Sequence, residues 1–352
     1  MYTGHPTITN EQVRQSPSPG RPWWGRLIRQ RSVQLTALGW VLANLLVLVT
    51  VNRALPFAWP ALADRSVLEH LLDANLALLQ VMLLMGVVFA LTRNRKPTEM
   101  AGRSPGRMVA RRETLLLFSY GILALIAGFV LPRLFGWHPF GLHLAGTIFG
   151  THDHVAPAEA LAWAVYNLLV YAAIPLIIFR RRYSTTQLNL RSVDRKNDAL
   201  VIVVVLAIES LFQFFVAEPE IFNLDARQLA LGATLTFLLY LAGAVLPAMI
   251  FIYAILVPRY LVLTGSTAST VILGGLTYTL LHIWDAWMIF SSPGSTVLSV
   301  IFLIMTYFGP GMIKTFLTVR TGNAWVHVWA YHALAPHTFL DTPHMVRVFR
   351  IT

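Results

Sequence analysis

Five of the side chains that can carry protons or bind metals stand out inside otherwise apolar stretches of the sequence. They are Glu209, His282, Asp285, His327 and His332. At the centre of a bilayer an ionisable residue costs about 3 kcal/mol or more unless it faces a partner or water. These residues therefore indicate a polar site at membrane depth. Imidazoles together with a carboxylate are also the donors that a catalytic zinc ion takes.

Their spacing predicts which of them meet. His282 and Asp285 are three residues apart and share a helix face. His327 and His332 are five apart, about 140° around a regular α-helix, so they do not both point at one site and we favour His332. We predict a zinc site formed by His282, His332 and Asp285. The alternative for each histidine is a structural hydrogen bond to a carbonyl inside the protein.

Glu209 is the candidate catalytic acid or base. It shares a helix face with Gln213, four residues further on. Counting the helical rise from the expected helix ends places Glu209 and His332 about 15 Å deep and His282 about 20 Å deep. Three titratable groups from three helices are thus expected at nearly one level.

The elements that must position these groups are long apolar helices. Of the 352 residues, 56% are hydrophobic and 12% charged, about half of the roughly 25% charged residues of a soluble protein. The absence of cysteine excludes disulfides, iron–sulfur clusters and thiolate zinc sites. The net charge of +11 comes from Lys and Arg placed mostly between the apolar stretches, which indicates topology signals in a lipid bilayer and not nucleic-acid binding.

This pattern predicts an all-α, polytopic transmembrane helical bundle with eight or nine spans. In the eighth stretch Gly309, Pro310 and Gly311 predict a kink or break, and Gly274 and Gly275 in the seventh predict close helix packing. The ninth stretch contains several histidines and Pro336, so it is either a span or a re-entrant piece. The expected spans are 33–52, 71–92, 114–135, 160–179, 199–216, 229–257, 268–290, 295–318 and 324–340.

The basic residues predict orientation and organisation. They gather before the first span and in the second and fourth connections, so the N-terminus is expected in the cytoplasm and the chain in the cell (inner) membrane. The first thirty residues are polar and Pro-rich, so no secretory signal peptide is expected. We divide the chain into a basic Pro/Arg-rich cytoplasmic tail (1–32), N-terminal transmembrane helices (33–160) and a transmembrane core (161–345).

Short motifs in the C-terminal half carry a family resemblance. Tyr278-Thr279-Leu280-Leu281-His282 is similar to a Phe-x-x-x-His motif, and Arg320-Thr321-Gly322-Asn323 through His332 is similar to a Thr-Gly-Ser-like turn that leads into a histidine-bearing helix. With Pro175 and the run Phe179 to Tyr183, they make residues 170–340 resemble the CPBP family of CAAX-protease and bacteriocin-processing intramembrane metallopeptidases. The resemblance implies a CPBP-like helical core with His282 and His332 at the depth of the family's metal site.

The sequence departs from this family at its acidic motif. Ala248 and Met249 stand where the resemblance places a glutamate pair, Tyr253 where it places an arginine, and Pro336 where it places Asn or Asp. Our main hypothesis is therefore a non-proteolytic CPBP-like membrane protein that acts as a subunit or scaffold with other membrane-protein subunits. One alternative is a divergent intramembrane zinc metallopeptidase using His282 and His332 with Glu209. Another is an intramembrane binder of a His-ligated cofactor.

A second group of histidines follows the third span. We predict that this connection is a polar extracytoplasmic loop, with surface metal binding as the alternative, because an extended His-x-His places two imidazoles on one side. Its residues are His138, His143, His152, Asp153 and His154.

Overall fold

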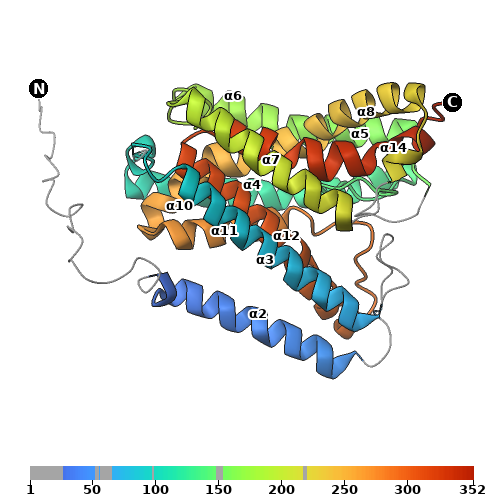
Figure 1. Cartoon of the computed structure of the whole chain (residues 1–352), viewed down its shortest axis with the longest axis horizontal. Coiled ribbons are helices and arrows are strands. Elements are labelled where there is room, and N and C mark those ends of the chain that lie inside the picture. Colours follow the sequence, from blue (N-terminus) through green and yellow to red (C-terminus); the bar gives the residue numbers. More distant parts are fainter. Residues whose placement is uncertain (1–26, 52–54, 56–65, 97–98, 148–153, 217–219) are drawn as a thin grey trace, which may run out of the picture.

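The computed structural model describes residues 27–51, 55, 66–96, 99–147, 154–216 and 220–352. All regular elements in these ranges are helices, and seven helical runs are long and apolar enough to cross a membrane. This is therefore a membrane protein built as a helical bundle (Figure 1). The seven runs are α2 (Arg31–Thr50), α3 (Val67–Leu91), α4 with its 3-10 extension (Arg107–Phe135), α5 to α6 (Pro157–Arg180), α7 (Arg195–Phe214 of Arg195–Val216), α8 to α10 (Ala226–Thr264) and α12 (Pro293–Thr321).

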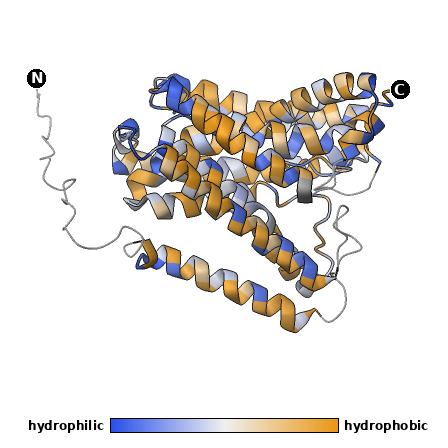
Figure 2. Cartoon of the chain, in the orientation of Figure 1, coloured by the Kyte–Doolittle hydropathy of each residue, from blue (hydrophilic) through white to orange (hydrophobic). Residues whose placement is uncertain are grey.

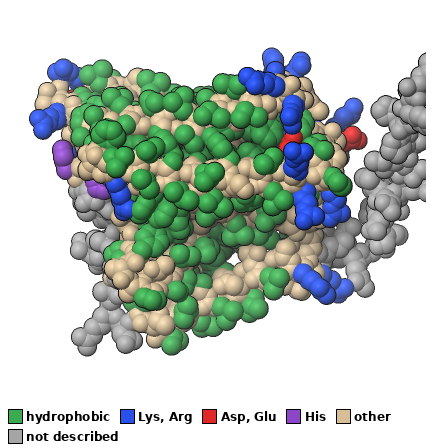
Figure 3. All heavy atoms as spheres, turned by 180° about the vertical axis from the view of Figure 1, so that it is seen from behind, with side chains coloured by type: hydrophobic (Ala, Val, Ile, Leu, Met, Phe, Trp, Pro, Cys, Tyr) green, Lys and Arg blue, Asp and Glu red, His purple; other side chains and the backbone are tan. Residues whose placement is uncertain are grey.

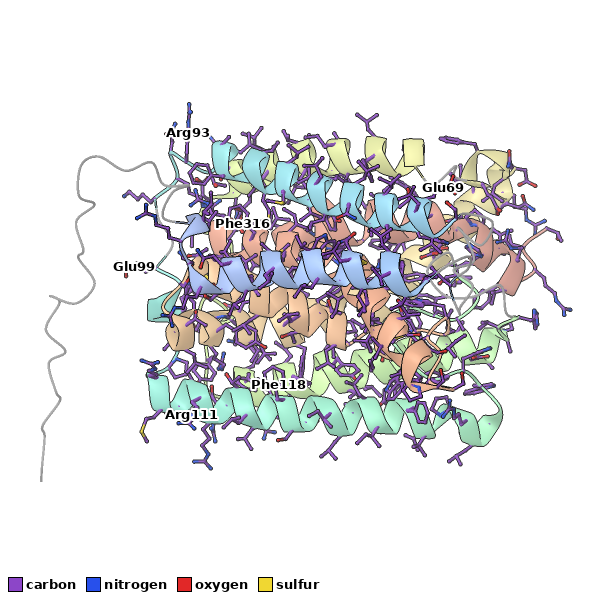
Figure 4. The ribbon with its side chains drawn as sticks, turned by 90° about the horizontal axis from the view of Figure 1, so that it is seen from below. Glu69, Arg93, Glu99, Arg111, Phe118 and Phe316 are labelled. Carbon is purple, nitrogen blue, oxygen red and sulfur yellow. The ribbon has the colours of Figure 1, made fainter. Side chains whose placement is uncertain are left out.

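Charge and hydropathy are segregated along the bundle. Hydrophobic residues dominate the ribbon along its length (Figure 2), and in the space-filling view apolar side chains cover the flank, whereas Lys and Arg gather toward the ends (Figure 3). Arg93, Glu99 and Arg111 lie at one end and Glu69 lies toward the other (Figure 4). We call the end that carries Arg93 and Arg111 the basic end. The expected tail, 1–32, lies almost wholly outside the described residues.

Two of the expected spans differ from full-length helices. α11 runs only from Thr267 to Leu280 and gives way to turns before α12 begins at Pro293. The ninth stretch is helical throughout most of Trp325–Val348, but it is assembled from short α and π segments: α13 (Trp325–His327), η9 (Val328–His332), η10 (Leu334–Phe339) and α14 (Leu340–Val348).

Of the predicted kink or break at Pro310, the break is wrong, because α12 continues through it. The predicted close packing of the glycines is confirmed. A Cβ on Gly311 would lie 2.8 Å from the Gly275 Cα, and a Cβ on Gly274 would lie 2.0 Å from the Thr315 Oγ1. α11 and α12 thus approach to backbone contact, as small residues allow in membrane helices. Packing of this kind helps α12 to tolerate the backbone hydrogen bond that Pro310 cannot donate.

π-helical turns interrupt two of the seven long runs and also the last stretch of the described chain. η5 (Leu168–Ala173) lies in the run Pro157–Arg180, and η7 (Leu241–Val245) and η8 (Met249–Leu256) lie in the run Ala226–Thr264. η9 and η10 lie in the last stretch. A π-turn adds a residue to the helical repeat and often lies beside a functional site. Here these turns lie in the helices that surround the buried polar groups described below.

The basic end is closed by a buried polar network around Asp198. Its Oδ1 accepts a hydrogen bond from Arg95 at 2.5 Å, and its Oδ2 accepts from Ser192 at 2.6 Å and from Asn323 at 2.9 Å. Arg95 also donates to the Thr321 carbonyl at 2.8 Å. This Asp198 network ties the start of α7 to the ends of α3 and α12, and so fixes where the last stretch enters the bundle.

Candidate functional site: a buried histidine cluster

Five buried imidazoles form a continuous row through the bundle. Successive ring centroids are 5.8 Å apart from His327 to His332, 5.2 Å from His332 to His337, 5.2 Å from His337 to His143, and 4.8 Å from His143 to His282. Their exposed fractions lie between 0% and 5%. We call these five residues the histidine cluster.

The π-helix explains how three of them align. His327, His332 and His337 are spaced by five residues, and the backbone bonds also span five, with Ala333 N donating to Val328 O at 2.9 Å. One turn of this helix therefore carries each imidazole above the previous one. Our sequence argument that His327 and His332 cannot face one site is wrong, because it assumed a regular α-helix.

His282 reaches the cluster because α11 ends just before it. Its Nδ1 lies 2.8 Å from the carbonyl oxygen of Tyr278, which can only accept, so Nδ1 carries the proton. The other ring nitrogen, Nε2, is buried and has no hydrogen-bond partner among the described residues. The His282 ring stacks on Tyr307 with centroids 3.9 Å apart. The side chain is thus oriented with one free nitrogen.

His143 enters from the connection after α4. The carbonyl of Gly141 accepts hydrogen bonds from Trp163 at 2.8 Å and Asn167 at 2.9 Å, which draws this stretch into the bundle. A Cβ on Gly141 would lie 2.9 Å from Asp285 Oδ1, so glycine permits the close approach. The prediction of a polar surface loop is therefore wrong for His143.

Two carboxylates flank the cluster. His143 Nδ1 lies 3.3 Å from Asp285 Oδ2 and 2.8 Å from Tyr307 Oη, and Tyr307 donates to the same carboxylate oxygen. His337 Nδ1 lies 3.4 Å from Asp341 Oδ2. Asp285 Oδ1 is buried without a hydrogen-bond partner among the described residues. Carboxylates placed behind imidazoles in this way fix the ring orientation and leave Nε2 for a ligand.

The predicted ligands His282, Asp285 and His332 are brought into this one region, though not side by side. Tyr278 stands between the two histidines: its ring centroid is 4.5 Å from that of His282, and its Oη is 3.2 Å from His332 Nε2. Asp285 reaches the cluster through His143. Within the described ranges, no three His, Asp or Glu side chains are gathered closely enough to hold a metal ion as they stand.

Glu209 is on α7, and its side chain lies at the contact of α7 with α3, apart from the histidine cluster. Its Oε2 accepts from Gln80 at 2.5 Å, and its Oε1 accepts from Gln213 at 2.8 Å, as their spacing predicts. Two amides therefore hold both carboxylate oxygens of this candidate catalytic residue.

The positions of the missing acidic motif lie in apolar surroundings. Ala248 and Met249 are 0% and 1% exposed and belong to the main hydrophobic core. Tyr253 is also fully buried, and its ring lies 4.2 Å from that of His327. No carboxylate from this stretch faces the histidine cluster.

The sequence reasoning missed His143, His337 and Asp341 as members of the site. A usable signal existed for the last two, because His337 and Asp341 are four residues apart and share a helix face. For His143 the signal was its apolar setting among Leu142, Leu144 and Ala145, all buried. Of its neighbours, His138 lies 2.8 Å from Glu159, whereas His152 and Asp153 lie outside the described residues.

Comparisons of this chain with protein-family models, with curated proteins and with solved structures give no match. The fold and the site therefore define the class: a polytopic helical membrane protein with imidazoles and carboxylates buried inside its bundle.

Proposed function

We propose that this protein is a divergent intramembrane metallohydrolase in which the histidine cluster binds zinc. One observation carries the proposal: the buried His282 Nε2 has no partner, although its ring stands beside that of His143. A buried polar atom left unpaired costs about 1–3 kcal/mol. A bound cation at this nitrogen removes that cost.

The donor chemistry fits zinc. His143, His282 and His337 each have Nδ1 near an acceptor, namely Asp285, the Tyr278 carbonyl and Asp341. Three imidazoles with an open fourth position make one of the known catalytic zinc sites. We propose these three as ligands, with Asp285 and Asp341 behind them and His332 adjacent. Because they are not gathered at ligand distance, binding requires their rings to turn toward one another.

Zinc held in this way supplies a bound water with a pKa of about 7. We propose that Asp285 accepts a proton from that water once the rings have turned, because its Oδ1 has no hydrogen-bond partner among the described residues while Tyr307 and His143 hold its other oxygen. We assign the general-base role to Asp285 in preference to Glu209, because two amides occupy the Glu209 carboxylate. The substrate class is an amide bond presented at membrane depth.

Zinc content tests the site. Protein purified in detergent from zinc-supplemented cells is expected to hold about one ion per chain by elemental analysis. His282→Ala and His143→Ala should each lose it, whereas His344→Ala, on α14 and paired with Arg347, should keep it. Metal-free wild-type protein would contradict the proposal. A visible absorption band lost in the same variants would favour the His-ligated cofactor instead.

Hydrolysis of a quenched fluorescent apolar peptide in proteoliposomes tests the activity. Asp285→Asn should lower the rate by about 10²- to 10⁴-fold. Its zinc content should fall far less than in His282→Ala and His143→Ala, because Asp285 orients a ligand without being one. A rate equal to that of the wild-type protein would remove Asp285 from the reaction.

A second candidate function is a non-proteolytic CPBP-like subunit or scaffold of a membrane complex. The apolar burial of Ala248 and Met249 favours it. It predicts zinc binding without hydrolysis, and co-purification with other membrane-protein subunits in mild detergent. A monomer without partners that cleaves the peptide would exclude this function.

We also propose that the chain lies in the cell (inner) membrane with the basic end in the cytoplasm, by the positive-inside rule. The sequence has no cysteine, so single thiols can report orientation. Phe222 lies at the end of the bundle opposite the basic end and is 74% exposed, and Phe222→Cys places a thiol there. Val193 lies at the basic end and is 56% exposed, and Val193→Cys places a thiol on that side. An impermeant maleimide added to spheroplasts should label only the former.

A further inference from the structure

A groove between α4 and α6 opens near the basic end. Its volume is about 270 Å³. Its apolar walls come from Leu116, Leu117 and Tyr120 on α4 and from Ile174, Pro175 and Ile178 on α6. The stretch from Glu113 to Tyr120 corresponds to about 10 Å of helical rise, so the groove runs inward from the end of the bundle along the helices.

At the inner end of the groove, the hydroxyl proton of the tyrosine already takes part in a hydrogen bond. Tyr120 donates its hydroxyl proton to the Val170 carbonyl at 2.6 Å. A hydrocarbon chain is therefore the suitable guest for this part, since it requires no hydrogen bond.

The mouth of the groove is positively charged. Glu113 lines it, but Arg259 lies 2.7 Å from Glu113 Oε2 and Tyr183 donates to Oε1 at 2.7 Å, so this acid is neutralised. Arg182 also lines the mouth and is exposed, and among the described residues no acid pairs with it. Arg181, Arg111 and Arg112 are exposed at the adjoining helix ends.

We propose that this groove binds an anionic phospholipid of the surrounding membrane, with one acyl chain between α4 and α6 and the phosphate at Arg182. The argument is charge complementarity: a cationic mouth above an apolar slot matches a lipid with an anionic head and a hydrocarbon tail. Anionic lipids gain about 1 kcal/mol for each Lys or Arg near the headgroup. This inference is independent of the proposed hydrolase.

Lipid titration of the delipidated protein, followed by native mass spectrometry, tests the groove. Phosphatidylglycerol and phosphatidylcholine with identical acyl chains are compared. Phosphatidylglycerol should bind more tightly than phosphatidylcholine. Arg182→Gln should weaken the binding of phosphatidylglycerol by about fivefold and so bring its affinity closer to that of phosphatidylcholine. Leu116→Trp, which fills the slot, should weaken both lipids.

Matched controls are available in the connection after α6 and on α4. Arg191→Gln changes an exposed arginine outside the groove, and Leu115→Trp enlarges a side chain on α4 that is 58% exposed and does not line it. Both should leave lipid binding unchanged. Equal losses in these controls, or unchanged binding in both groove variants, would overturn the proposal.

Discussion

Asp198 and Asp285 are both nearly buried, at 4% and 2% exposure, yet their surroundings differ. Both oxygens of Asp198 accept hydrogen bonds, from Arg95 on one side and from Ser192 and Asn323 on the other. Asp285 uses only one oxygen, which Tyr307 and His143 share. Both carboxylate oxygens of Asp198 are therefore satisfied, whereas Asp285 keeps one oxygen without a partner among the described residues.

The same contrast extends to the neighbouring groups. In the histidine cluster His282 Nε2, His332 Nδ1 and both ring nitrogens of His327 are buried without partners among the described residues. Most buried polar atoms in native proteins are paired, so a concentration of unpaired ones requires an explanation. Polar networks in which every group is paired fix structure, whereas buried polar groups left unpaired at membrane depth indicate a site that binds an ion or a ligand.

The largest expected effect is on the Asp198 network. Asp198→Ala leaves the Arg95 guanidinium buried without its carboxylate, and should lower the free energy of unfolding by about 3–5 kcal/mol. Denaturant titration in detergent measures this. In a double-mutant cycle, adding Arg95→Ala should cost far less than it does alone. Additive losses would mean that the two side chains are not coupled.

An intermediate effect of opposite sign is expected in the cluster. His327→Leu removes two unpaired nitrogens from a fully buried position. The free energy of unfolding should rise, or at least not fall, with about 1–3 kcal/mol of desolvation cost relieved. The same titration provides the measurement. A clear destabilisation would show that His327 already has a structural partner. The histidine cluster would then not differ from the Asp198 network in this respect.

The smallest effect is expected at the edge of the Asp198 network. The Asp194 side chain accepts from the backbone N–H of Asn197 at 3.1 Å at the start of α7. Asp194→Ala should cost about 1 kcal/mol, as loss of a helix N-cap does, and Asp194→Asn should retain most of the stability. Equal losses in both variants would assign the effect to charge instead of capping.

Much of the bundle could be predicted from the sequence because burial in lipid requires long apolar helices. The pairing of Glu209 with Gln213 and the contact at Gly275 followed from spacing and residue size. The composition of the site was harder to predict from the sequence. His143 reaches it through a stretch drawn inward by Trp163, and no local pattern shows which connection folds back into a bundle.

The helical repeat was the other obstacle. We assumed 3.6 residues per turn for the ninth stretch, and on that repeat His332 and His337 diverge. The π segments change this geometry, and propensity offers no simple signal for them. The continuity of α12 through Pro310 has a similar origin, since packing against neighbours overrides a local preference.

Three imidazoles stacked at five-residue intervals make the last stretch intolerant of added residues. One residue inserted between His332 and His337 would place them about 240° apart around an α-helix, and His337 would turn away from its partners. Deleting Ala335 would instead leave these two histidines four residues apart, on one face of an ordinary α-helix. Homologues that retain the row are therefore expected to have no additional residue between Asn323 and Asp341.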